Sequence, residues 1–385
     1  MEDTNMHQPK GTVKEVAGLF FKLGCIAFGG PAAHIAMMEE EVVNKRKWMD
    51  RQHFLDLIGA TNLIPGPNST EMTMHCGHER AGVPGLFAAG LCFIFPAVVL
   101  TGILAWAYVT YGQLPEVLPF INGIKPAVLA IIAGAVWKLG KKAIKGWELA
   151  VLASLVLLSS LAGLNEILAL LTAGVLGTFY LTFSRSADGS FKAMLPLLLS
   201  PKMLLMVQEL SHWKIFLSFL KVGAVLYGSG YVLFAYLDAE LVAQGWLSRQ
   251  ELIDAVAVGQ FTPGPVLSTA TFIGYQLGGI GGALAATAGI FLPSFLFVWV
   301  LNPLVPKMRS SKPLGYFLDS VNAAAVAVML AVLIHMAAET LLDWRAILIA
   351  LLGGLATFGP VKLNAIWIVL GGAALGYLLQ FVQFG

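Results

Sequence analysis

The stretches IPGPNSTE at residues 64–71 and TPGPVLST at residues 262–269 break two apolar segments with the same three residues. Proline removes a backbone donor and clashes with the preceding helical turn, and glycine adds conformational freedom, so Pro-Gly-Pro ends one helix and begins another. The free amides and positive dipole end of the new helix would suit an anion. The alternative is a tolerated helix kink, and two copies in register favour the anion site.

Composition predicts an all-α polytopic membrane protein. Of 385 residues, 57% are hydrophobic and 12% are charged, with a mean hydropathy of +0.78. Soluble domains carry about 25% charged residues. Apolar segments recur along the chain, at 14–38, 83–111, 124–140, 147–163, 165–183, 211–237, 278–304, 316–338, 344–358 and 361–382. The N-terminus lacks the basic start of a cleaved signal, and we expect a multi-pass protein of the cell inner membrane.

The two halves of the chain are a duplication. FKLGCIAFGG at 21–30 aligns with LKVGAVLYGS at 220–229, and WMDRQHFLD at 48–56 aligns with WLSRQELID at 246–254. The two Pro-Gly-Pro breaks fall in the same register. We therefore expect an N-terminal repeat at 1–190, a linker at 191–204 and a C-terminal repeat at 205–385.

Basic residues between the apolar segments predict that the second repeat is inverted. Residues 38–53 contain Lys45, Arg46, Lys47 and Arg51, whereas the matching residues 237–250 contain only Arg249. The next pair has the opposite bias, since 305–315 is more basic than 112–125, and the third pair, 138–146 and 335–345, reverses again. By the positive-inside rule the repeats have opposite orientations, as in many secondary transporters.

Inversion requires an odd number of crossings in each repeat. Each half has six apolar segments, including the more polar 53–80 and 251–275. We expect five crossings and one re-entrant hairpin at Pro-Gly-Pro. The alternative makes the Gly29-Gly30-Pro31 segment re-entrant as well and lets residues 193–210 cross once.

Polar residues at the breaks form the predicted anion site. Lys22 and Lys221 occupy matching places seven residues before Gly29 and Gly228, where each supplies a counter-charge or snorkels to the interface. The full predicted substrate set is Lys22, Gly29, Gly30, His34, Gly66, Asn68, Ser69, Thr70, Lys221, Gly228, Gln260, Thr262, Gly264 and Ser268.

Three carboxylates are candidates for proton or ion coupling: Asp56, Glu71 and Asp254. Asp56 and Asp254 match between the repeats, and the alternative for both is a charge at the membrane surface. HCGHER at 75–80 does not have the spacing of a metal site, so we expect no metal and no cofactor. Cys25, Cys76 and Cys92 provide no disulfide framework, and a net charge of +2 gives no reason to expect a nucleic-acid partner.

The sequence resembles the chromate ion transporter family in its long, two-repeat form. The resemblance covers nearly the whole chain and rests on FGGPAAHI at 28–35, IPGPNSTE at 64–71, RAG at 80–82, FTPGP at 261–265 and IGY at 273–275. It implies gradient-driven export of chromate, a tetrahedral dianion similar in shape to sulfate.

Two other functions stay open at the level of sequence. Sulfate or another oxyanion would suit the same donors, and an anion channel would use the same breaks. No set of residues suggests an enzyme. The expected partners are a small inorganic anion and membrane lipid, and the sequence does not determine the oligomeric state, a homodimer included.

Overall fold

A computed structural model describes residues 11–28, 30–61, 64–164, 166–185, 211–227, 230–301, 312–360 and 363–382. All regular secondary structure in these residues is helical. Four helices are long and apolar enough to cross a membrane: Asn68–Tyr111, Leu118–Ala143, Val266–Val300 and Pro313–Thr340. The expected all-α polytopic fold is confirmed.

The two repeats contain corresponding elements in the same order. The first has α1 (Val13–Ile26), α2 (Pro31–Met38), the π-helix η1 (Glu39–Lys45), α3 (Arg51–Thr61), α4 (Asn68–Tyr111), α5 (Leu118–Ala143), α6 (Trp147–Leu161) and α7 (Glu166–Arg185). The second has α8 (His212–Val225), η2 (Gly230–Val232), α9 (Leu233–Leu237), the π-helix η3 (Asp238–Val242), α10 (Arg249–Phe261), η4 (Val266–Ser268), α11 (Thr269–Leu301), α13 (Lys312–Thr340), α14 (Trp344–Phe358) and α15 (Ala365–Leu379).

In the first repeat, α1 forms one hairpin with α2 and η1, and α3 forms a second hairpin with the first arm of α4. Each hairpin returns to the end of the molecule from which it starts. Glu15, near the start of α1, accepts a hydrogen bond from Trp48 Nε1 at 3.0 Å and pairs with Arg80 at 3.1 Å. His53, near the start of α3, lies 3.2 Å from Glu79. The beginnings and ends of both hairpins therefore meet at one end of the molecule.

The expected count of one hairpin per repeat is wrong, because residues 14–38 do not form a single crossing. Gly30 has a φ of 80° and Pro31 opens α2, so the chain turns back after α1. The start of α1 lies at the same end as Trp48, whereas five crossings would separate them. The alternative with both breaks re-entrant describes the fold, and residues 193–210 lie outside the described residues.

The long helices α4 and α11 each fold back once before they cross. Gly82 has a φ of 64° and Gly279 a φ of 60°, and the residues before them are also non-helical. A Cβ on Gly77 would collide with the carbonyl oxygen of Gly85, which shows how closely the two arms of α4 pack. The first arm of α4, before the kink at Gly82, is therefore the exit arm of the second hairpin, and the crossing helix is the second arm at 83–111.

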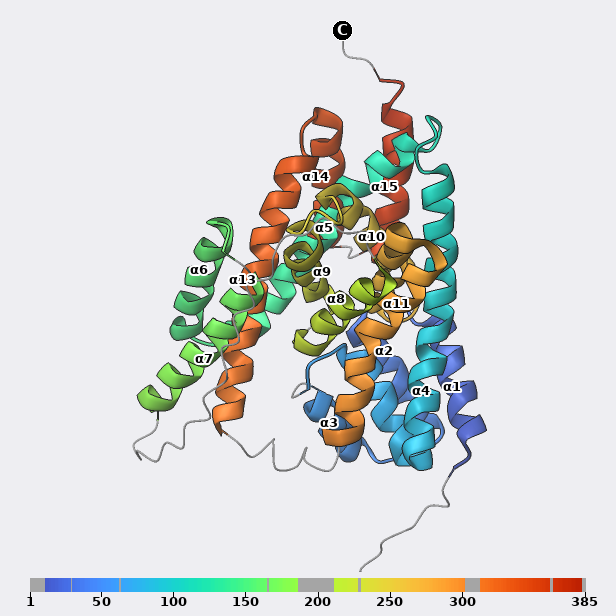
Figure 1. Ribbon diagram of the computed structural model, residues 1–385, viewed down its shortest axis with the longest axis vertical. Coiled ribbons are helices and arrows are strands. Elements are labelled where there is room, and N and C mark those ends of the chain that lie inside the picture. The colour runs from blue at the N-terminus through green and yellow to red at the C-terminus, as the bar shows by residue number, and fades with distance from the viewer. Residues whose placement is uncertain are drawn as a thin grey trace, which may run out of the picture.

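The C-terminal helices of each repeat pack on the other repeat. The second repeat's α14 and α15 contact α5, and the first repeat's α6 and α7 contact α13, as Figure 1 shows for the green and orange helices. Close approach at α5 requires Gly123, where a Cβ would collide with the backbone of Gly372. This exchange, together with the packing of α4 on α11, joins the two repeats into one body.

Candidate functional site

The helix breaks of the two repeats meet at the centre of the molecule. The amide of Gly66 donates a hydrogen bond to Leu226 O at 2.6 Å, and the amide of Gly264 donates one to Ala27 O at 2.9 Å. Each bond joins the Pro-Gly-Pro break of one repeat to the end of the first helix of the other repeat. The two bonds are related by the same pseudo-symmetry as the sequence repeats.

Both Pro-Gly-Pro glycines are required by the local backbone. Gly66 has a φ of 143° and Gly264 a φ of 89°, which other residues rarely adopt. A Cβ on Gly264 would lie 2.9 Å from the Cβ of Ala97. Proline on either side prevents the preceding helix from continuing, so the sequence itself places these breaks.

A cavity of about 1030 Å³ adjoins the breaks. Its wall comes from α2, the break regions, the C-terminal half of α5, the N-terminal half of α13 and parts of α14 and α15. Six residues predicted for the substrate site line this cavity: Gly30, His34, Asn68, Gln260, Thr262 and Gly264. The structure thus brings together residues from both repeats.

Polar groups without partners lie in the part of the wall formed by the breaks. His34 is 2% exposed, and its Nε2 donates a hydrogen bond to Ala27 O at 3.1 Å, which leaves Nδ1 buried without a partner. The Nε2 of Gln260 is also buried and has no hydrogen bond within the part of the chain that the structure describes. Buried polar groups are usually paired, and because both atoms are closed off from the cavity in this conformation, they are candidates for contact with a ligand after the wall rearranges.

Lysines on α5 surround the mouth of the cavity. Lys138 and Lys142 lie one helical turn apart in its wall, and neither has an ion-pair partner among the described residues. Lys145, also in the wall, pairs with Asp319 at 2.6 Å. Their basic segment predicts the orientation of the chain, and the spacing of Lys138 and Lys142 on one helical face also indicates a basic cavity lining.

The other predicted residues that the structure describes lie outside the cavity wall: Lys22, Asp56, Gly66, Ser69, Thr70, Glu71, Lys221, Asp254 and Ser268. Ser69, Thr70 and Ser268 are buried beside the breaks, and Ser268 Oγ accepts a hydrogen bond from Thr101 at 3.2 Å. Gly29 and Gly228 are outside the described residues.

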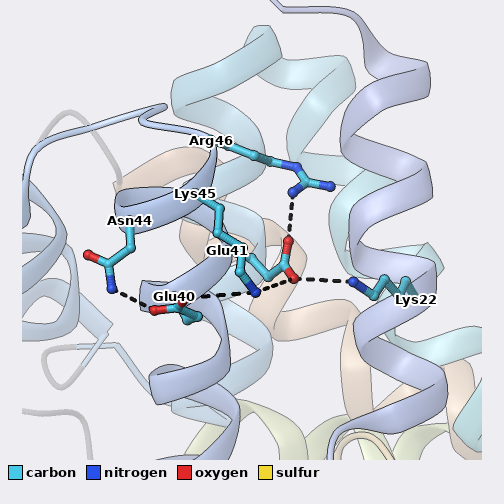
Figure 2. A network of polar contacts seen from close by, with 6 residues as sticks. All are labelled: Lys22, Glu40, Glu41, Asn44, Lys45 and Arg46. Carbon is cyan, nitrogen blue, oxygen red and sulfur yellow. Dashed lines mark hydrogen bonds and ion pairs between the residues drawn. The ribbon is translucent and has the colours of Figure 1, made fainter.

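Lys22 and Lys221 each bind a glutamate on the returning arm of their own hairpin. Lys22 pairs with Glu41 at 3.2 Å, and Lys221 pairs with Glu240 at 2.5 Å. Figure 2 shows Glu41 in contact with Lys22 and also with two basic residues that follow it in the chain, Lys45 and Arg46. Both lysine side chains are more than half exposed, whereas the glutamates are buried. These pairs connect the two arms of each hairpin.

The three candidate coupling carboxylates have different surroundings. Asp56 accepts a hydrogen bond from Gln52 at 3.4 Å on the partly exposed face of α3. Asp254 is buried and pairs with Lys125 at 3.4 Å, and it accepts a hydrogen bond from Tyr108 at 2.6 Å. Glu71 is completely buried, has no ion-pair partner among the described residues, and lies beside the hydroxyl of Ser294.

His75 and His78 lie on the exit arm of the second hairpin, after the first Pro-Gly-Pro break. No group of three or more His, Cys, Asp or Glu side chains suitable for a metal occurs in the described part of the chain. His75 is buried on the exit arm of the second hairpin.

Comparison with known proteins identifies related sequences over nearly the whole chain. The model of the chromate transporter family matches residues 14–178 and again residues 213–377. A chromate transport protein of Cupriavidus metallidurans is 30% identical over 374 residues, which cover 96% of this chain and 93% of the relative. A chromate transport protein of Pseudomonas aeruginosa is 28% identical, with 96% and 93% covered. An uncharacterized transporter of Methanocaldococcus jannaschii is 27% identical, with 94% and 92% covered. No solved structure matches the chain.

Proposed function

The chain belongs to the chromate transporter family, and we propose that it is a secondary transporter that exports chromate from the cytoplasm across the inner membrane. Two of its relatives, from Cupriavidus metallidurans and Pseudomonas aeruginosa, are named chromate transport proteins. The observation that carries the proposal is the cavity that leads from exposed lysines at its mouth to the joined breaks.

The mouth of the cavity supplies attraction for an anion. Lys138 and Lys142 place two positive charges at the entrance, and a concave surface lined by one sign of charge concentrates ions of the opposite sign. Lys145 contributes less, because Asp319 already neutralises it. A dianion such as chromate gains more from these charges than a monovalent anion does.

The inner end of the cavity supplies groups that replace the hydration shell of the anion. Gln260 donates from its side-chain amide, and Asn68 begins the helix that follows the first Pro-Gly-Pro break. His34 uses Nε2 to bind Ala27 O, so it donates to an anion only when Nδ1 also carries a proton. We propose these three residues, with the backbone at Gly30 and Gly264, as the substrate site.

The charge pattern supports a cytoplasmic opening. Lys138, Lys142 and Lys145 belong to the basic segment that the positive-inside rule assigns to the cytoplasm. Towards the other side, α10 carries Asp254, which with Lys125 and Tyr108 forms a buried cluster between α10, α5 and α4. We infer that this conformation is open inward and that the cluster closes the outward path, as alternating access requires.

The second candidate substrate is sulfate, because both oxyanions are tetrahedral dianions and the cavity offers no group that separates them. Export against a gradient also separates a transporter from a channel. In inverted vesicles, accumulation of labelled chromate that depends on an applied ion gradient supports a secondary transporter, whereas simple equilibration indicates a channel.

The cavity lysines provide the direct test. Replacing Lys138 and Lys142 together with glutamine is expected to raise the half-saturating chromate concentration about five- to tenfold, and added salt should reduce the difference from the wild type. Lys141→Gln is the matched control, because Lys141 lies over the ring of Trp137 at 4.6 Å and is not part of the cavity wall. An unchanged half-saturating chromate concentration in the double variant, or an equal rise in Lys141→Gln, would contradict the proposed entrance.

A further inference from the structure

Glu71 is a buried acid for which the packing of the protein provides no counter-charge. It lies on the first turn of α4, three residues after Asn68 in the cavity wall. Its exposed fraction is 0%, it has no ion-pair partner among the described residues, and its polar neighbour is the hydroxyl of Ser294. Since i and i+3 share a helical face, Glu71 lies one turn behind the cavity lining.

The carboxyl group lies between the first Pro-Gly-Pro break and the second repeat. A Cβ added to Gly66 would fall on Oε1 of Glu71 and on Oγ of Ser294, so all three groups are in close proximity. Ser294 Oγ is likewise buried and is the hydrogen-bonding neighbour of the carboxyl group. The titratable neighbours are the partly buried Tyr227, close to the end of α8, and His75, one turn further along α4.

The second repeat does not carry an acid at the matching place. Thr269 corresponds to Glu71, and its hydroxyl donates a hydrogen bond to Val266 O at 2.7 Å. Ala97 corresponds to Ser294 and lies beside Gly264. Because the same fold forms with threonine and alanine at these positions, packing of the repeat does not require the acid.

An ionised carboxylate that is buried without a cation is strongly unfavourable in a protein interior, and one neighbouring hydroxyl does not offset this. Burial therefore favours the protonated form of Glu71 in this conformation. If the anion occupies the cavity one helical turn away, a negative charge on Glu71 would repel it, whereas the neutral acid would not. Binding of the proton and binding of the anion are then linked, and each favours the other.

We propose that Glu71 is the proton site of the transporter, and that its protonation is coupled to occupancy of the cavity by the anion. The inference rests on the proposed function, because it assumes that an oxyanion binds at the breaks. Separation of the breaks, which are joined through the amide of Gly66, would expose the carboxyl group to water and allow the proton to leave.

Binding of sulfate to the purified full-length protein, measured by calorimetry between about pH 5 and 9, tests the coupling. In the wild type we expect the affinity to fall about tenfold or more as the pH rises, since the acid loses its proton, and we expect proton uptake when sulfate binds in weak buffer. Glu71→Gln and Glu71→Thr should lose most of that pH dependence and proton uptake, and what remains is assigned to His34, which donates to the anion only when its Nδ1 also carries a proton.

The threonine variant carries the residue that the second repeat already accommodates, so it tests the idea even if the glutamine variant does not fold. Glu79→Gln, on the same arm of α4 but in a surface pair with His53, should keep the pH dependence of the wild type. If both Glu71 variants keep the full pH dependence of the wild type, Glu71 is not the proton site, and the proposed function is unaffected. A wild type that binds neither sulfate nor chromate overturns the proposed function and this inference with it.

Discussion

Single glycines determine how closely the chain approaches the ligand. Gly264 combines a φ of 89° with a place in the cavity wall and contact with Ala97. Gly279 has a similar left-handed conformation, with a φ of 60°, but open space around its Cβ position and no part in the wall. The pair therefore separates the cost of backbone strain from a direct effect on the anion.

We predict that Gly264→Ala lowers thermal stability and also raises the half-saturating chromate concentration, and that Gly264→Leu has a far larger effect on transport. Gly279→Ala should lose stability by a similar amount, on the order of 1–3 kcal/mol, with unchanged affinity. Abundance, thermal midpoint and transport kinetics of the three variants measure this. If Gly264→Ala and Gly279→Ala have the same half-saturating chromate concentration, the Gly264 break serves the fold alone.

The sequence predicted which residues surround the breaks better than it predicted which of them face the cavity. Gly264 and Gly66 are equivalent by repeat, yet only Gly264 lines the cavity, and Gly66 instead contacts Glu71 and Ser294. Repeat symmetry treats both breaks alike, whereas a single conformation opens to one side only. Sequence alone therefore could not divide the predicted site.

Hairpins are the elements that bring the breaks to the centre, and the first hairpin of each repeat has an equivalent Lys–Glu ion pair between its arms. Glu240 is buried, and Lys221 is its partner in the described residues. Glu41 has additional contacts with Lys45 and Arg46, so the pair in the N-terminal repeat is a less simple test of this role than Lys221 and Glu240. The positions of both pairs favour a structural role over direct contact with the anion.

We predict that Lys221→Met alone destabilises the protein, because it leaves the buried Glu240 charge without a partner. The double variant Lys221→Met/Glu240→Gln should recover most of the lost thermal stability, with an interaction energy of about 0.5–3 kcal/mol in the double-mutant cycle. Transport affinity should change little in the double variant. If the Lys221→Met variant loses chromate affinity but keeps normal stability, Lys221 belongs to the substrate site.

The glutamate partners were detectable from the sequence, because Glu41 and Glu240 follow their lysines at the same spacing in both repeats. The first hairpin was harder to recognise. Residues 14–38 are apolar enough to resemble one crossing, and only the backbone at Gly30 shows that the chain returns. Hydropathy reports the length of an apolar segment, not its path.

At the scale of the whole molecule, duplication and inversion were readable from sequence, but the exchange of C-terminal helices was not. Packing of α14 and α15 on α5, and of α6 and α7 on α13, depends on which apolar faces meet in space. Apolar membrane helices carry little partner-specific information in their composition. The exchange encloses the cavity with parts of both repeats, so that a movement of one repeat against the other changes its shape.

A site-directed labelling experiment tests whether an inward-open cavity leads an oxyanion to the joined breaks. Asn322, in the α13 part of the wall, is changed to cysteine after Cys25, Cys76 and Cys92 have been replaced. A membrane-impermeant thiol reagent is applied to inverted and to right-side-out vesicles, with sulfate as the protecting anion because chromate oxidises thiols. We predict rapid labelling in inverted vesicles that sulfate slows, and little labelling from the other side. Labelling from the outer side alone, or inward labelling that sulfate does not affect, would contradict the inward-open anion site.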